Sequence, residues 1–427
     1  MNILITGATG FIGSAITKAL ISKNHTVTVC VRDLQYAQSQ FPKAILLNFD
    51  EDLACSEDYW VRLLRKVDVV INCLGVFNKS QQERLHTQMP IALFTTAKTL
   101  NVKLCIQISA LGVDKTDIHY ATSKKAADDF LLSLDIPAII LRPSLVYASG
   151  SYGGTSLFRG MASLPYIIPV VGSGEQLFQP IHINELTNAI CNLIDAPPAK
   201  PIILNAVGKD QISLKELLKN YRSWLGFKKA LVIKIPVRLI EWICKLGNKS
   251  GSPVINMTAF AMLSQDNVSS EAEVEKFQTA ANLKLKSFAE NLYSMPSFVQ
   301  DRWQAKLYFL RPLLRISIGI TWLLSGIVSL IAYKKSLNFL TELPISSIVH
   351  WPFLIGASFL DILLGLASLL SYKIKKISLI QILVITIYTV VISIFLPALW
   401  LDPFGAVLKN SVIIIATLIL IAISDLR

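Results

Sequence analysis

The sequence predicts an α/β domain with a doubly wound parallel sheet, followed by an all-α bundle of about four transmembrane helices. Three observations predict this architecture. A glycine-rich turn joins an apolar run to a helix at the start of the chain, and strand-like and helix-like segments then alternate. Long uncharged runs gather after about Leu307. The alternation is typical of a parallel sheet with helices on both faces.

Composition and charge narrow the possible classes of protein. The 427 residues suffice for two or three domains, and 52% hydrophobic residues with a mean hydropathy of +0.51 are too apolar for a wholly soluble chain. The net charge is +12, yet no dense Lys/Arg run suggests a nucleic-acid partner. A cofactor phosphate and membrane lipid are the expected partners for this charge. The six scattered cysteines predict reduced core residues, with no disulfide framework and no metal site.

The glycine turn is the first candidate site. Gly7, Gly10 and Gly13 follow an apolar run that predicts a buried strand, and residues 14–21 predict a helix. Backbone N–H groups in such a turn point at a ligand, and the positive end of the helix dipole favours a phosphate. Gly7 permits the turn, Gly10 lets the backbone approach a pyrophosphate, and Gly13 lets the helix lie close to the strand. An ordinary tight turn is the alternative.

The end of the second expected strand bears on the choice of nucleotide. Residues 25–31 predict a strand, and Arg32-Asp33 follows it. This position meets the adenosine ribose in a dinucleotide fold, where an acidic residue favours NAD and an arginine favours the 2′-phosphate of NADP. Because Arg32 comes first, NADP(H) is favoured over NAD(H). A solvated Arg-Asp turn is the alternative.

Further strands bring more residues to the same edge of the sheet. Residues 44–49, 67–72 and 104–108 predict three further strands. Residues 60–65 and 93–100 predict two helices between them. These strands lead to Asp50, Gly75 and Ser109. The carboxyl ends of parallel strands meet at one edge, so we expect these residues to gather there with the glycine turn.

A tyrosine and a lysine after the fifth strand form the candidate catalytic pair. Tyr120 and Lys124 are four positions apart in a helix-like segment, so they share one helix face. A neighbouring ammonium lowers the pKa of a phenol, which lets the phenol exchange a proton while a nicotinamide transfers a hydride. Ser109 could hold the substrate carbonyl. The alternative is a surface helix in which both side chains are incidental.

Taken together, these residues resemble a short-chain dehydrogenase/reductase of the atypical or extended kind, which implies a Rossmann fold. The resemblance covers about residues 1–230. The motifs that carry it are Thr6-Gly7-Ala8-Thr9-Gly10-Phe11-Ile12-Gly13, Asn72-Cys73-Leu74-Gly75, Ser109, Tyr120-x-x-x-Lys124 and Arg142-Pro143-Ser144.

The resemblance implies a role for each matching residue. The cofactor-binding turn would comprise Gly7, Thr9, Gly10, Phe11, Ile12 and Gly13, with the glycines around the pyrophosphate. Asp50 would contact the adenine, and Gly75 would line the ribose path. Lys124 would hold the nicotinamide ribose, and Pro143 would lie near the nicotinamide. His182 and Asn184 depart from the family, in which an aspartate is more usual two residues after the histidine.

Two stretches resemble a narrower group, the NADPH-binding accessory subunit of respiratory complex I and its relatives. These stretches are 108–114 and 300–303, and some bacterial relatives carry a DoxX-like membrane tail. Many members bind the nucleotide without turning over a known substrate, and several have lost the tyrosine. This chain keeps Ser109, Tyr120 and Lys124, which favours chemistry.

The chain divides into three expected segments. Residues 1–230 would form the nucleotide domain with a small substrate lobe, 231–307 a partly helical connector, and 308–427 the transmembrane domain. Apolar residues of the lobe, among them Met161 and Ile168, suggest a lipophilic ligand. Ordinary core packing explains them equally well.

Four apolar segments predict the membrane bundle. They run over 316–333, 351–372, 377–401 and 404–424, and each approaches or exceeds the ~20 residues needed to cross a bilayer. Basic residues gather on one side of these spans, notably at Arg302, Lys306, Arg311, Arg315, Lys373, Lys375, Lys376 and Arg427. With no signal-peptide pattern after Met1, this bias predicts a multi-pass inner-membrane protein whose N-terminal domain and C-terminus are cytosolic.

Asp361 is the one acid deep in an apolar segment. A carboxylate at membrane depth is costly and is therefore a functional candidate. A helix–helix hydrogen bond to a Ser or Thr is an equally good explanation.

Three functions remain open. The first is a membrane-anchored NAD(P)H-dependent oxidoreductase that acts on a lipophilic carbonyl or a quinone-type substrate by Tyr/Lys-assisted hydride transfer. The second is a non-catalytic NADPH-binding module that serves the assembly, stability or redox sensing of a membrane-protein complex. Epimerase or dehydratase chemistry on a nucleotide sugar is less favoured, because the short Ser109–Tyr120 loop and the apolar lobe suit a sugar poorly.

Overall fold

The computed structural model describes residues 1–76, 79–249, 257–403 and 405–424. The chain divides into two compact units, Met1–Ala305 and Lys306–Arg427, which we call unit 1 and unit 2. Each unit is described by itself.

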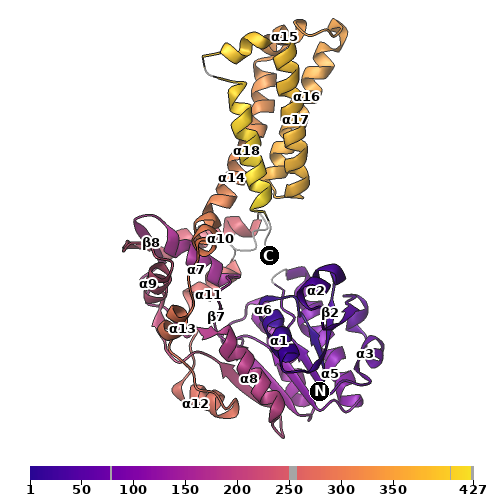
Figure 1. Ribbon diagram of the computed structural model, residues 1–427, viewed down its shortest axis with the longest axis vertical. Coiled ribbons are helices and arrows are strands. Elements are labelled where there is room, and N and C mark those ends of the chain that lie inside the picture. The colour runs from indigo at the N-terminus through magenta and orange to yellow at the C-terminus, as the bar shows by residue number, and fades with distance from the viewer. Residues whose placement is uncertain (77–78, 250–256, 404, 425–427) are drawn as a thin grey trace. The chain divides into compact units, whose positions relative to one another are not determined.

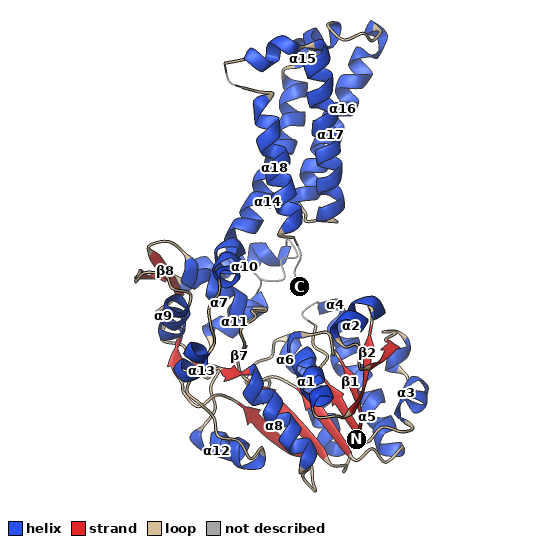
Figure 2. Cartoon of the chain, in the orientation of Figure 1, coloured by secondary structure: helices blue, strands red, loops and turns tan. Residues whose placement is uncertain are grey.

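Unit 1 is built on a seven-stranded sheet in the order β11-β6-β5-β4-β1-β2-β3, with every neighbouring pair parallel (Figure 2). The strands are β1 (Asn2–Thr6), β2 (Thr26–Val31), β3 (Ile45–Asn48), β4 (Val69–Asn72), β5 (Leu104–Ile108), β6 (Ala138–Pro143) and β11 (Ile202–Ala206). The chain winds outward in both directions from β1, so the predicted doubly wound parallel sheet is confirmed. The edge beyond the carboxyl ends of β1 and β4 is the usual ligand position in such a sheet.

Helices cover both faces of this sheet over two separate apolar cores (Figure 1). One face carries α1 (Phe11–Ser22), α8 (Ile183–Asp195) and α12 (Glu271–Ala280), and the other carries α3 (Glu57–Leu64), α5 (Met89–Thr99) and α6 (His119–Ser133). Ile3 and Ile5 belong to the first core and Leu4 to the second, as the two-residue period of a strand requires.

The remaining elements of unit 1 are short. They are α2 (Leu34–Gln40), η1 (Leu53–Cys55), α4 (Lys79–Gln82), the π-helix η2 (Glu83–Gln88), β7 (Val146–Tyr147), α7 (Gly154–Ser163), β8 (Ile167–Val171), β9 (Leu177–Phe178), β10 (Ile181–His182), β12 (Ile212–Ser213), α9 (Leu214–Trp224), β13 (Leu231–Ile235), α10 (Val237–Lys249), α11 (Met257–Ser264) and α13 (Phe288–Ser294).

The segment 231–307, expected as a connector, contributes to the body of unit 1 as far as Ala305. Its strand β13 pairs in parallel with β8. Phe277 of α12 is fully buried in the core beneath α1 and α8. This segment therefore adds its own strand and core residues to unit 1.

A buried chain of polar side chains joins three strands at their carboxyl ends. Thr6 donates to Asn72 Oδ1 at 2.6 Å, and Asn72 Nδ2 donates to Gln107 Oε1 at 2.8 Å. The backbone N–H of Leu74 also donates to Asn72 Oδ1, at 3.2 Å. All three side chains are buried, so Asn72 fixes both the strand ends and the turn that leaves β4.

A buried histidine holds the segment after β4 against α6. The Nε2 atom of His86 accepts from the backbone N–H of Val76 at 2.9 Å, which leaves Nδ1 to donate to the Ser123 hydroxyl at 3.0 Å. Burial, with a smaller contribution from the Lys124 charge, lowers the pKa of His86 to about 3. The folded chain therefore keeps this imidazole neutral.

Unit 2 is helical. Its elements are α14 (Val299–Ile331, which begins in unit 1), α15 (Tyr333–Thr341), η3 (Ser347–Val349), α16 (His350–Leu369), α17 (Ile374–Phe395), η4 (Pro397–Leu401) and α18 (Leu408–Ala422). Among the described residues, three helical stretches are long and apolar enough to cross a membrane, Val299–Ile331, Ser347–Leu369 and Ile374–Phe395.

The fourth predicted span is shorter than expected. Of the segment 404–424, helix α18 takes 15 residues, fewer than the ~20 that cross a bilayer. Pro403 disfavours helix at Asp402, and Gly405 adopts a φ of +60° while its N–H bonds to the Asp402 carbonyl. This turn delays the start of the helix.

Close helix packing in unit 2 depends on glycines. A Cβ at Gly326 of α14 would lie 2.4 Å from the Ser358 carbonyl oxygen of α16. A Cβ at Gly365 of α16 would lie 2.5 Å from the Leu323 nitrogen of α14. The two helices therefore touch backbone to backbone, as small residues allow in membrane bundles.

We expect Asn72→Ala to destabilise unit 1 by about 2–4 kcal/mol, because it leaves Thr6, Gln107 and the Leu74 N–H without their partner in a buried site. Asn48→Ala, at the exposed end of β3, is the matched control and should cost less than about 0.5 kcal/mol. Hydrogen exchange of β4 and β5 peptides in the full-length protein measures both. Equal effects of the two substitutions would contradict the argument.

The folded pKa of His86, about 3, lies below the value near 6.5 of an unfolded histidine. The unfolded chain binds more protons between these values, so stability falls as the pH drops from 6.5 toward 3. His86→Gln should therefore reduce the slope of the unfolding free energy against pH, by up to about 1.4 kcal/mol per pH unit between pH 4 and 6. Urea titrations at several pH values test this, and an unchanged slope would refute it.

Candidate nucleotide and catalytic site

The glycine turn has the shape that a pyrophosphate needs. Gly7 adopts a φ of +68°, and a Cβ on it would lie 2.8 Å from the Cys73 carbonyl carbon. A Cβ on Gly13 would lie 2.2 Å from the Gly7 oxygen. Gly10 is the N-cap of α1 and no side chain caps that helix, so its first N–H groups can bind an anion. These residues fit a dinucleotide.

The other predicted residues of the turn lie beside the glycines. Thr9, Phe11 and Ile12 are half-buried at the start of α1. The Phe11 ring stacks on Tyr152, with ring centres 5.8 Å apart and planes inclined by 14°. The loop after β7 therefore lies against the entrance to α1.

Arg32 and Asp33 follow β2 as predicted, but they have different partners. Arg32 is 66% exposed and pairs with Glu51 at 2.9 Å. The Asp33 carboxylate accepts from the Tyr36 N–H and caps α2. Asp50 accepts from the backbone N–H groups of Asp52 and Leu53, and so caps η1. The Arg32 side chain is thus exposed, whereas the Asp33 and Asp50 carboxylates bond to the backbone.

Lys124 is the buried centre of the second half of the site. Its ammonium donates to the Leu74 carbonyl at 2.8 Å and to the Ile108 carbonyl at 2.9 Å, which joins α6 to the ends of β4 and β5. Burial lowers the pKa of Lys124 to about 8, although Asp128 opposes the shift. A Cβ on Gly75 would lie 3.9 Å from the Lys124 nitrogen, so the structure brings these two predicted residues together.

Tyr120 corrects one expectation. Burial raises the pKa of its phenol to about 12, whereas the sequence predicted a value lowered by Lys124. The Tyr120 ring meets the His86 ring edge-on at 5.3 Å, and the Lys124 ammonium bonds to two backbone carbonyls. Removal of the phenol from water therefore sets the direction of its pKa shift, and the side chain stays protonated at neutral pH.

Ser109 belongs to a buried ion-pair network. Its hydroxyl donates to Asp128 Oδ2 at 2.7 Å, and Arg142 Nε donates to the same oxygen at 3.1 Å. Arg142 also pairs with Asp114. The hydroxyl proton of Ser109 is thus committed to Asp128, and its role toward a substrate carbonyl stays a prediction. Pro143, at the end of β6, accepts from the Leu111 N–H and fixes the loop that follows Ser109.

Sequence reasoning missed several residues that line this region. His86 contacts Tyr120 and Ser123, and His119 pairs through Nδ1 with Gln82 Oε1 at 2.9 Å. Nothing in their spacing marks them, although His86 follows the carboxyl end of β4 and His119 that of β5, where ligands bind in such sheets. Within the described part of the chain, no three His, Cys, Asp or Glu side chains are grouped to hold a metal ion.

The stretch that departs from the family has a structural role. His182 is the N-cap of α8 and accepts from the Asn184 N–H through Nδ1, in a capping box with Glu185. In the lobe, Met161 and Ile168 are buried, so core packing accounts for both.

Comparison with known proteins agrees with the fold. The profile of the NAD dependent epimerase/dehydratase family matches residues 3–206, and that of the DoxX-like family matches residues 319–418. A ceramide reductase of Caulobacter vibrioides is 24% identical over 54% of this chain and 72% of its own length. A UDP-glucose 4-epimerase of Vibrio cholerae is 26% identical over 58% of this chain and 83% of its own.

Solved structures extend the likeness in fold. The UDP-glucose 4-epimerase of Thermotoga maritima superposes with a TM-score of 0.54 at 15% identity, over 73% of this chain and 100% of that one. The UDP-glucuronic acid 4-epimerase of Bacillus cereus, solved with NAD, gives 0.53 at 17% identity, over 72% and 99%. The chain thus joins a Rossmann domain like those of the NAD dependent epimerase/dehydratase and short-chain dehydrogenase/reductase proteins to a DoxX-like domain.

Proposed function

We propose that the protein is a membrane-anchored NAD(P)H-dependent reductase of a lipophilic carbonyl. The observation that carries the proposal is the pair Tyr120 and Lys124, one turn apart on α6, of which the phenol is protonated and the ammonium is buried at the ends of β4 and β5. The relative named ceramide reductase supports a lipid as the substrate class. The carbonyl that fits this name is a ketone at the position of the secondary alcohol of ceramide, because its reduction would give that alcohol.

The chain's own residues account for the proton in this reaction. The nucleotide, when bound, supplies the hydride. Tyr120 carries its proton at neutral pH because its pKa is about 12, so it can donate to the carbonyl oxygen as negative charge develops there. Lys124 has a pKa of about 8 and is mostly charged at pH 7, so it stabilises the phenolate that remains.

NADP(H) is the proposed nucleotide. Arg32 is exposed at the end of β2, where a 2′-phosphate would lie, and the neighbouring acid Asp33 is committed to the cap of α2. Glu51 competes for Arg32, so NADPH must displace one surface ion pair, which costs little.

The topology is also part of the proposal. The basic residues beside the apolar helices favour a multi-pass protein of the inner membrane with unit 1 in the cytosol. A cytosolic C-terminus in addition requires α18, with its 15 residues, to cross as a short fourth span. Cytosolic nucleotide would then reach unit 1 directly.

A second candidate function follows from Ser109 and Lys124. Both side chains bond within the protein, Ser109 to Asp128 and Lys124 to two carbonyls. A domain in which these contacts serve stability alone would bind the nucleotide without turnover and act as a module of a membrane-protein complex.

The relative named as a UDP-glucose 4-epimerase makes UDP-glucose a necessary control substrate.

We expect Tyr120→Phe to lower the rate of carbonyl reduction by about 10²–10⁴-fold, because it removes the proton donor. NADPH binding should persist. The measurement is oxidation of NADPH by the full-length protein in mild detergent, with keto-ceramide as the substrate. Epimerisation of UDP-glucose, which has no carbonyl for NADPH to reduce, is followed separately. Tyr166→Phe, at an 85% exposed position, is the matched control and should leave the rate unchanged.

Two outcomes would contradict this function. Full activity in Tyr120→Phe would exclude Tyr120 as the donor. Stoichiometric NADPH binding without oxidation by any carbonyl would favour the binding module.

We expect Arg32→Ala to weaken NADPH binding about tenfold or more and to leave NADH binding nearly unchanged, because only NADPH carries the 2′-phosphate. Glu51→Gln should strengthen NADPH binding, since it releases Arg32. Fluorescence titrations of both nucleotides measure these effects, with Arg62→Ala on the exposed face of α3 as the control. Equal losses for NADH and NADPH would remove Arg32 from 2′-phosphate recognition.

A further inference from the structure

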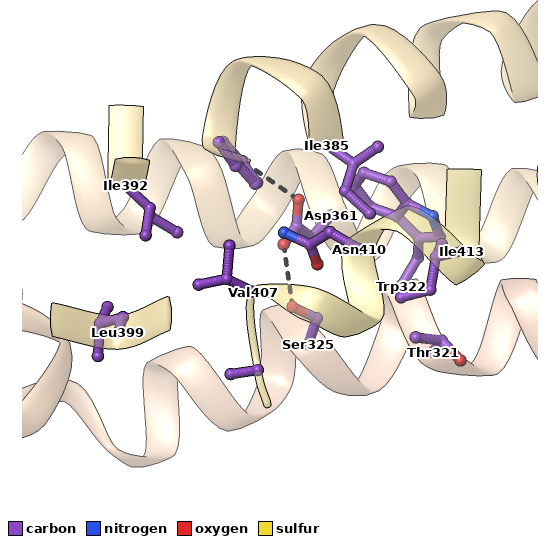
Figure 3. A pocket seen from close by; sticks show the side chains of 12 residues that line it. Thr321, Trp322, Ser325, Asp361, Ile385, Ile392, Leu399, Val407, Asn410 and Ile413 are labelled. Carbon is purple, nitrogen blue, oxygen red and sulfur yellow. Dashed lines mark hydrogen bonds between the residues drawn. The ribbon is translucent and has the colours of Figure 1, made fainter. Parts of the chain in front are cut away.

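Unit 2 contains a partly open cavity of about 240 Å³ around Asp361 (Figure 3). Four helices line it, with Trp322 and Ser325 from α14, Asp361 from α16, Tyr388 from α17 and Asn410 from α18. Figure 3 shows the Asp361 carboxylate in the middle of this group. The polar groups therefore line one cavity, and the rest of its wall is mostly apolar.

The Asp361 carboxylate has weak partners for its charge. Only 6% of the residue is exposed, and its two oxygens accept from the hydroxyls of Ser325 and Tyr388, each at 3.3 Å. Hydroxyl bonds to a carboxylate are normally 2.5–2.7 Å long. No ion pair between described residues includes Asp361. An acid buried in this way leaves room for a stronger, cationic donor.

A larger apolar groove, of about 730 Å³, lies beside this cavity. The two spaces share Tyr388, Ile392 and Leu399 as lining residues, so they are neighbours across one layer of side chains. The groove is lined almost wholly by apolar side chains of 339–360 and 387–399. A Cβ on Gly356, which lines the groove, would meet no atom within 4 Å, so this part of the wall is open.

We infer that unit 2 binds a single-chain lipid amine, with the ammonium at Asp361 and the alkyl chain in the groove. A polar, acidic cavity next to an apolar groove matches an amphiphile with a cationic head. The charge of Asp361 disfavours a fatty acid, whose carboxylate would be repelled, and a fatty alcohol offers only a neutral donor. This site is separate from the nucleotide site of unit 1, and the inference stands whether or not unit 1 reduces a carbonyl.

Photo-crosslinking of the full-length protein in nanodiscs tests this site. The probe is hexadecylamine with a diazirine in the middle of its chain, and the labelled peptides are identified by mass spectrometry. We expect labelling in 339–360 and 387–399. Unlabelled hexadecylamine should compete at least about tenfold better than hexadecan-1-ol or hexadecanoate, because only the amine pairs with the acid. Equal competition by all three would overturn the proposal.

Two variants test separately the binding of the ammonium at Asp361 and the binding of the alkyl chain in the groove. Asp361→Asn should reduce labelling about tenfold, whereas Glu342→Gln, an equal charge change at an exposed position, should not. Gly356→Phe should exclude the chain while Asp361 remains, and the open space around Gly356 means that the bundle can accept this ring. Unchanged labelling in both Asp361→Asn and Gly356→Phe would refute the site. NADPH oxidation is not part of the readout, so failure here is distinct from failure of the reductase.

Discussion

The Lys124 ammonium is the interaction on which the rest of unit 1 depends. It donates to carbonyls at the ends of two neighbouring strands, and so fixes α6 over β4 and β5. Tyr120 lies one turn away on the same helix, so its position follows from that attachment. The buried chain of Thr6, Asn72 and Gln107 gives the strand ends beneath it a fixed register. The Lys124 side chain thus both attaches α6 to the sheet and determines where Tyr120 lies.

Local patterns were sufficient to predict the sheet and the residues that follow the carboxyl ends of its strands. The strand–glycine–helix signal of Gly7 to Gly13 and the residues at strand ends, such as Gly75 and Ser109, depend only on nearby sequence. Partners could not be read from the sequence, because they come from distant segments. Asp128 reaches Ser109 across 19 positions, and His86 meets Tyr120 from a different helix. The raised pKa of Tyr120 has the same origin, since burial is a property of tertiary packing.

In unit 2, the difference between the predicted and the observed length of the fourth apolar helix also has a local cause. Apolar content predicted four spans of similar length, but the turn from Asp402 to Gly405 delays α18 and leaves it 15 residues. A hydropathy average depends only on residue type and carries no information about where the backbone departs from helical geometry. Asp361 was recognised as costly from its position alone. The sequence left open whether it bonds to another helix, and the structure shows that it bonds to hydroxyls on two of them, α14 and α17.

The glycine contacts between α14 and α16 also decide how the bundle can move. At Gly326 and Gly365 the two backbones are already in contact, so these helices behave as one rigid pair. Separating them would expose polar backbone atoms and lose their tightest packing. A molecule that reaches the Asp361 cavity therefore does not pass between α14 and α16 at these glycines. The same glycines that hold the bundle together thereby close one route to its polar interior.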